Sequence, residues 1–249
     1  MDRVRRAQIS AQQQQAFEAT QEAVRARARR EREFWEEVQD RAREAMGSNV
    51  LDGVALGLVP ANLRPLVPLP KERAESFLGF LASLIQQVEE TPDEAPIPDE
   101  EHAEFRSMPL AVARAACGTC RGFCCRTGDR HAYQDIASVR SFRARHPDLD
   151  SEEIVRRYRE LLPSVTYEGA CVFQAEGGCA LPRSMRSVTC NRFHCKDLKD
   201  LAAEVNKGVD HVFIASADDD RIQRTLLLKV VPDAGDAGSS GGSEAQLAT

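Results

Sequence analysis

The chain carries eight cysteines, concentrated in one 79-residue part of its 249 residues. The first four lie within nine residues: Cys117, Cys120, Cys124 and Cys125. The other four are more widely spaced: Cys171, Cys179, Cys190 and Cys195. Two thiols spaced C-x-x-C can converge on one tetrahedral ion, and thiolates are soft ligands that select zinc, iron or copper(I) over magnesium and calcium. The pattern therefore predicts that all eight cysteines are metal ligands and that the metal is zinc or iron, the iron alone or in an iron-sulfur cluster.

The cellular compartment decides between metal ligands and disulfides. The opening Met-Asp-Arg-Val-Arg-Arg is charged and no apolar core of signal-peptide length follows it, which predicts a cytoplasmic protein. A reducing cytosol keeps thiols reduced and favours metal binding. A disulfide or redox pair, and simple buried thiols, are the alternatives. No run of 18 apolar residues occurs, so no membrane span is predicted.

The adjacent pair Cys124 and Cys125 is informative, because neighbouring side chains leave the backbone in different directions on a strand or a helix. The two thiols are therefore expected to serve two separate sites or to bridge a cluster. One is expected to join the site begun by Cys117 and Cys120, and the other to face the site containing Cys171, Cys179, Cys190 or Cys195. Arginines interleaved with the cysteines could offset the negative charge of two four-thiolate sites, or could be solvated surface groups. They are Arg121, Arg126, Arg183, Arg186 and Arg192.

The spacing from about Ala115 to Lys196 resembles the YkgJ-type cysteine-cluster proteins, a zinc- or iron-chelating family related to the cysteine-rich part of flagellin lysine N-methylase. The residues that fit the family pattern are Cys117, Cys120, Cys124 and Cys125, then Cys171-Val172-Phe173, Gly178-Cys179, and Arg186 to Cys190 with Phe193. The chain departs from it at Ser187, where a proline is usual, and at Asn191, where an arginine often follows the cysteine. The resemblance implies metal binding.

The leading hypothesis is a metal-binding protein whose metal site is structural or adaptor-like, and an enzyme is the competing hypothesis. The resemblance to the flagellin methylase suggests an iron-sulfur or metal-dependent activity, either redox chemistry or methyl transfer to protein lysine. No Gly-rich loop, G-x-S-x-G or H-E-x-x-H motif supports it, and no catalytic residue is assigned. His194 could replace a thiolate as a ligand, although a supporting or surface role is favoured. The remaining histidines, expected at the surface, are His102, His131, His146 and His211.

Charge and composition limit the partners. The formal charge of -6 and a pI near 5.5 argue against a dedicated nucleic-acid binder. The preference for arginine over lysine indicates a GC-rich bacterial genome. Residues 3–46 contain no Gly or Pro and predict one long charged helix, which either lies along its own domain or binds a protein partner.

The chain divides into five predicted regions that position the cysteines. They are a long charged helix (1–48), a helical and irregular packing segment (49–90), an acidic Pro-rich linker (91–104), the cysteine-cluster metal-binding domain (105–232) and a disordered tail (233–249). Within them, apolar spacing and caps predict helices over 71–90, 134–145, from Asp150 to Leu162 and over 196–206, and a hairpin over 209–231. The expected fold class is mainly α, with a long N-terminal helix and a small irregular α+β domain stabilised by metal.

Overall fold

The computed structural model describes residues 2–91 and 108–231. These residues make a chain that is about 53% helical, with seven α-helices and a small sheet, as the predicted mainly α class requires. The predicted linker, beyond residue 91, and the predicted tail lie outside the described residues. No helix in the described ranges is long and apolar enough to cross a membrane.

The helices and strands follow one another in mixed order. The α-helices are α1 (Asp2–Met46), α2 (Lys71–Glu90), α4 (Leu110–Cys120), α5 (Ile136–Arg145), α6 (Ser151–Glu160), α7 (Val188–Arg192) and α8 (Lys196–Val205), with short 3-10 helices at Cys124–Thr127 and Arg183–Met185. The strands are β1 (Val54–Pro60), β2 (Leu66–Pro68), β3 (Val165–Tyr167), β4 (Gln174–Ala175), β5 (Gly178–Cys179), β6 (His211–Asp218) and β7 (Arg221–Lys229).

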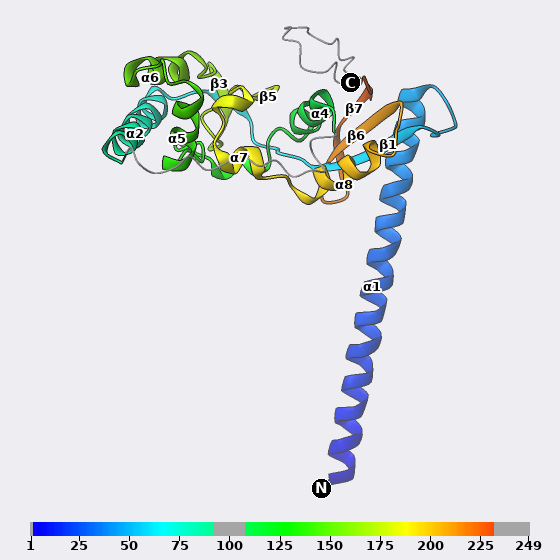
Figure 1. Ribbon diagram of the computed structural model, residues 1–249. Coiled ribbons are helices and arrows are strands. Elements are labelled where there is room, and N and C mark those ends of the chain that lie inside the picture. The colour runs from blue at the N-terminus through cyan, green and yellow to red at the C-terminus, as the bar shows by residue number, and fades with distance from the viewer. Residues whose placement is uncertain (1, 92–107, 232–249) are drawn as a thin grey trace.

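Among the described residues, the long helix α1 packs against the rest of the chain only near its C-terminal end. Val38 and Ala42 are 0% exposed there, whereas Phe17 and Val24 are 59% and 62% exposed. Figure 1 shows the remainder of α1 standing out from the body of the molecule. The predicted helix is confirmed, but most of it does not lie along its own domain. It ends where Gly47 adopts a φ of 63°.

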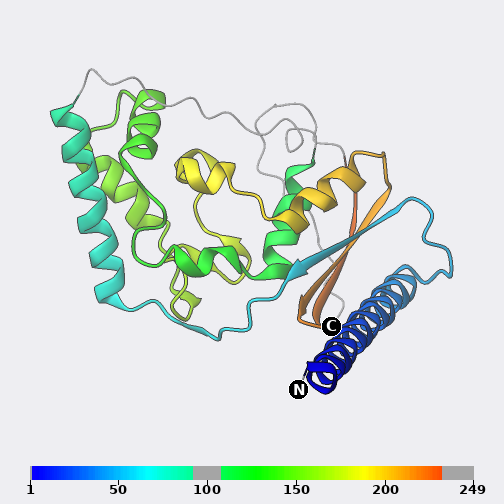
Figure 2. The same ribbon diagram turned by 90° about the horizontal axis from the view of Figure 1, so that it is seen from below.

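A three-stranded sheet in the order β1-β6-β7 lies beside this end of α1. The central strand β6 is buried on both faces, because successive side chains of a strand point to opposite sides. Val212 and Ile214 pack in a cluster with α4 and α8, here called the sheet core, while Phe213 and Ala215 pack against α1. The sheet is thus covered by α4 and α8 on one face and by α1 on the other (Figure 2).

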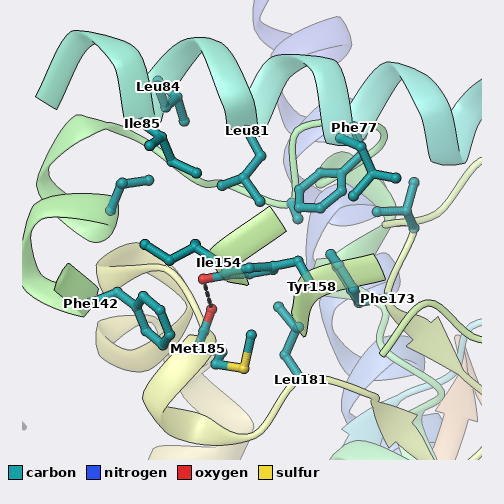
Figure 3. Packing of buried hydrophobic residues seen from close by; sticks show 14 of the residues in the cluster. Phe77, Leu81, Leu84, Ile85, Phe142, Ile154, Tyr158, Phe173, Leu181 and Met185 are labelled. Atoms are coloured by element: carbon teal, nitrogen blue, oxygen red, sulfur yellow. Dashed lines mark hydrogen bonds between the residues drawn. The ribbon is translucent and has the colours of Figure 1, made fainter. Parts of the chain in front are cut away.

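A second cluster, here called the helical core, lies among α2, α5 and α6 (Figure 3). The predicted apolar stripe of α2 packs there, and Phe77 meets Phe173 edge to face with ring centroids 4.8 Å apart. Tyr158 of α6 donates its hydroxyl to the Met185 carbonyl at 2.7 Å, so its polar end is satisfied inside the core. This core carries the aromatic packing of the domain.

Several local predictions are confirmed. Helices α2, α5, α6 and α8 occupy their expected ranges, and β6 and β7 form the expected hairpin. Asp150 caps α6 by accepting from the Glu153 amide at 2.8 Å, but the Glu153 side chain pairs with Arg156 and Arg157 and does not reach back to the cap.

In the predicted packing segment 49–90, the part before α2 is not irregular throughout as expected. Its residues 54–60 form β1, which runs parallel to β6 with Val54 opposite His211. Gly57 makes this packing feasible, because a Cβ there would lie 2.9 Å from a methyl carbon of Leu201 in α8. The segment therefore shares the sheet with region 105–232, and through α2 it also shares the helical core.

Candidate metal centre

Cys117 and Cys120 lie on the last turn of α4. The helix ends at Arg121, whose φ of 56° is left-handed, and Gly122 follows with a φ of 67°. This reversal turns the Phe123 amide back toward the preceding helix, where it donates to the Cys120 sulfur at 3.2 Å. Backbone N–H groups that point at a sulfur favour its thiolate form.

Cys124 and Cys125 begin the 3-10 helix that follows. The Cys125 thiol donates a hydrogen bond to the Cys124 sulfur, which lowers the pKa of Cys124 to about 7 and raises that of Cys125. The two adjacent thiols therefore interact directly with each other.

The four later cysteines come from four separate elements. Cys171 lies in the loop after β3, Cys179 in β5, Cys190 in α7 and Cys195 at the N-cap of α8. The Cys171 amide donates to the Cys125 carbonyl at 2.9 Å, which ties this loop to the first cysteine segment. Ser187 caps α7 by accepting from the Cys190 amide at 3.0 Å.

Electrostatic interactions link four cysteines near the end of α4, here called the first group: Cys117, Cys120, Cys124 and Cys195. Burial of its sulfur, together with the charges of the other three members, raises the pKa of Cys117 to about 12, although part of the residue reaches the surface. Burial likewise raises the pKa of Cys120 to about 11, with contributions from Cys124 and Cys195. Cys195 therefore joins the segment of Cys117, and is separated from its sequence neighbour Cys190.

The remaining four cysteines form the second group: Cys125, Cys171, Cys179 and Cys190. All four line one enclosed cavity of about 20 Å³, which is room for a single water-sized sphere. Burial raises the pKa of Cys171 to about 12, and the neighbouring charges of Cys179 and Cys190 act in the same direction. Cys190 also lies in electrostatic range of Cys124, so the two groups are adjacent.

The two groups belong to different cores. Cys120 and Cys195 pack with the sheet core, whereas Cys125, Cys171 and Cys179 pack with the helical core. The boundary between the groups falls at the Cys124–Cys125 peptide bond. The cysteines consequently occupy the junction of the two cores.

Three arginines place positive charge beside the cysteines. Arg186, one of the five expected from the sequence, lines the second group's cavity and lowers the pKa of Cys117 and of Cys190. Sequence reasoning missed Arg73 of α2, which acts on Cys171, and Arg224 of β7, which interacts with Cys120. No sequence signal marks these two, because packing of distant elements brings them to the cysteines.

Two other expected arginines face aromatic rings. The Arg126 guanidinium lies 3.4 Å from the centroid of the Phe123 ring, and Arg121 lies 5.9 Å from that of Tyr167. Cation–π contact accounts for these positions.

Among the histidines, His131 accepts from the Tyr133 amide at 3.0 Å and His146 packs on Phe142 with ring centroids 4.6 Å apart. His102 lies outside the described residues. A supporting role for His194 stays a prediction. Gln174 and Tyr133 also line the cavity of the second group, and the sequence analysis missed both.

The cysteines are the right type of ligand for a soft metal, but their side chains are not placed around a common point. Within residues 2–91 and 108–231, no three His, Cys, Asp or Glu side chains converge closely enough, as placed, to enclose a metal ion. Eight reduced cysteines, divided four and four, nevertheless supply the ligand type and number of two tetrathiolate sites. Comparisons with protein-family models, curated proteins and solved structures find no match for this chain.

Proposed function

We propose that this chain is a metal-binding protein in which zinc or iron, held by the two cysteine groups, has a structural role and joins the sheet core to the helical core. The observation that carries the proposal is the division of eight reduced cysteines into two neighbouring groups of four at the junction of the cores. Buried thiols without a ligand do not require such grouping, whereas tetrahedral thiolate sites do.

The chain supplies the surroundings that thiolate ligands need. Arg186 places positive charge between the groups, and the Phe123 amide donates to the Cys120 sulfur. A bound cation supplies the charge that stabilises four thiolates, which in structural zinc sites contributes on the order of 10 kcal/mol to folding.

The first experiment measures metal content. The full chain, purified without oxygen, is expected to contain one or two zinc or iron atoms, and the absorbance distinguishes colourless zinc from an iron-sulfur cluster. Removing the metal with a chelator is expected to unfold the region around 117–195, followed by circular dichroism. Less than about 0.5 metal per chain, with a spectrum unchanged by chelator, would refute the proposal.

The second experiment uses Cys124→Ser and Cys125→Ser, each a control for the other. A serine hydroxyl is hard and mostly protonated, so each change should cost its own site most of its affinity. Each variant is expected to lose one metal, and not the same one, if the sites are separate. If both residues feed one cluster, either change removes the whole signal. Full metal content and unchanged thermal stability in both variants would show that neither cysteine is a ligand.

The other functional hypotheses stay predictions. An iron-sulfur or methyl-transfer enzyme rests on the sequence resemblance alone, as does membership of the YkgJ-type family. Cytoplasmic location and bacterial origin rest on sequence patterns. The exposed Phe17 and Val24 leave an apolar surface on α1 that a protein partner could cover, which is the partner-binding role expected of this helix.

A further inference from the structure

Gln174 of β4 is a buried polar side chain whose hydrogen bonds are incomplete. It is 1% exposed, and its amide nitrogen Nε2 has no hydrogen-bond partner among the described residues. Buried amide groups nearly always have hydrogen-bond partners in the protein. A buried amide without one has lost its hydrogen bonds to water and gained none in return. The same side chain lines the cavity enclosed by the second cysteine group. The unused donor therefore lies at the candidate metal centre.

The backbone of Gln174 is tied to this group by three contacts. Its amide donates to the Cys171 carbonyl at 2.9 Å, and it pairs with Cys179 across the β4–β5 hairpin. The buried Thr166 hydroxyl lies 3.0 Å from the Cys171 carbonyl and 2.9 Å from that of Gln174. The position of the residue relative to both cysteines is thus fixed by the main chain.

The side chain of Gln174 reaches the other cysteine segment as well. A Cβ at Gly122 would lie 2.4 Å from its Cδ, Nε2 and Oε1 atoms, so only glycine leaves room for the amide. Gly122 separates Cys120 from Cys124, both in the first group. The amide consequently lies between the two groups.

Building on the metal binding proposed above, we infer that the Gln174 amide is a positioning residue that donates hydrogen bonds to metal-bound cysteine sulfurs and connects the two groups. Metal-bound thiolates accept N–H hydrogen bonds, and such bonds orient the ligands and adjust the metal's electronic properties. The primary amide has two N–H donors, which matches one donor for each group. This role accounts for a buried donor that has no hydrogen-bond partner among the described residues.

The test compares the full-length wild type with Gln174→Leu, using cobalt(II) as a spectroscopic probe and chelator competition for affinity. Leucine fills similar space without a donor, so the affinity is expected to fall 10- to 100-fold, as for other residues that support metal ligands. The sulfur-to-cobalt absorption band is expected to shift, because the sulfurs lose a hydrogen bond. Gln174→Glu, which offers a negative acceptor in place of a donor, should lose more affinity.

Gln134→Leu is the matched control. Gln134 is also a buried glutamine, but its Nε2 donates to the Met185 carbonyl at 3.0 Å, and it is not among the residues that line the second group's cavity. This variant should lower stability in the metal-free and the metal-loaded protein alike, and leave the cobalt band in place. Gln174→Leu should instead shift the cobalt band and leave the stability of the metal-free protein largely unchanged.

The outcomes separate the two proposals. If wild type binds cobalt and Gln174→Leu shows the same affinity and absorption band, Gln174 is only a packing residue and the inference is wrong, while the metal site stands. If wild type binds no cobalt, zinc or iron, the proposed function fails and the inference with it.

Discussion

Replacing Gly122 with alanine tests the close contact between the two cysteine segments. Its φ of 67° is left-handed, which costs an L-residue about 1–2 kcal/mol. The added Cβ would also lie 2.4 Å from the Gln174 amide, and forcing such an atom into a packed interior costs about 1–3 kcal/mol. Since Gln174 is buried and pinned at its backbone, its side chain has little room to withdraw. Gly122→Ala is therefore expected to lower the free energy of unfolding by about 2–5 kcal/mol.

Substitutions at two other glycines separate the cost of backbone strain from the cost of the contact with Gln174. Gly47 has a similar φ of 63° but nothing within 4 Å of an added Cβ, so Gly47→Ala measures backbone strain alone, about 1–2 kcal/mol. Gly177, close to Gln174 in sequence, has open space and no left-handed φ, so Gly177→Ala should be neutral or slightly stabilising. Urea unfolding followed by circular dichroism gives all three values, with the slope m as a check on the unfolded state.

The test is whether Gly122→Ala lowers the free energy of unfolding more than Gly47→Ala does. A cost at Gly122 no larger than the cost at Gly47 would show that the Gln174 amide does not press on this turn. Alanine at position 122 would then leave room for the Gln174 amide between the cysteine groups, which would refute the prediction.

Three further predictions concern the helices of the helical core. Tyr158→Phe should lower the free energy of unfolding by about 1 kcal/mol in urea, because the Met185 carbonyl loses one hydrogen bond but keeps that from Gln134; a loss above about 3 kcal/mol would contradict this. Asp150→Ala removes the cap of α6 and should also cost about 1 kcal/mol, seen as a lower melting temperature, and an unchanged melting temperature would count against it. Hydrogen bonds from two arginines of α6 lower the pKa of Glu153 from 4.5 to about 2, so the stability it contributes is complete above pH 4.5 and lost as the pH falls toward 2. Glu153→Gln should flatten that acid part of the stability profile, and an identical profile would show that the ion pairs contribute nothing.

Helices α5 and α6 could be predicted because the information that sets them is local. Asp135 and Asp150 accept the hydrogen bonds of their own helix starts, and the apolar residues recur at helical spacing. The hairpin of β6 and β7 is local in the same sense. In contrast, β1 has its partner strand far away in the sequence, and a seven-residue run ending in proline carries no signal of that pairing.

Some features of the candidate site are also set by local sequence, and others depend on contacts between distant elements. Residue type and the adjacent pair Cys124 and Cys125 predicted a soft-metal site with two parts. The partition of Cys190 and Cys195 into different groups could not be predicted, because it depends on contacts between distant elements. The Val188 amide of α7 donates to the Ser138 hydroxyl of α5, whereas α8 packs in the sheet core. Gln174 was missed for a related reason. Its side chain lies against Gly122, which is more than fifty residues earlier in the sequence.

The protruding helix α1 has a hydrodynamic consequence. At 1.5 Å per residue its 45 residues span about 68 Å, whereas a compact chain of this size has a radius of gyration of about 18 Å. Viscous drag depends on the longest dimension, so a single chain of 27.6 kDa should elute early in gel filtration and sediment slowly. An apparent mass from elution volume alone would mimic a dimer, and light scattering would give the true mass.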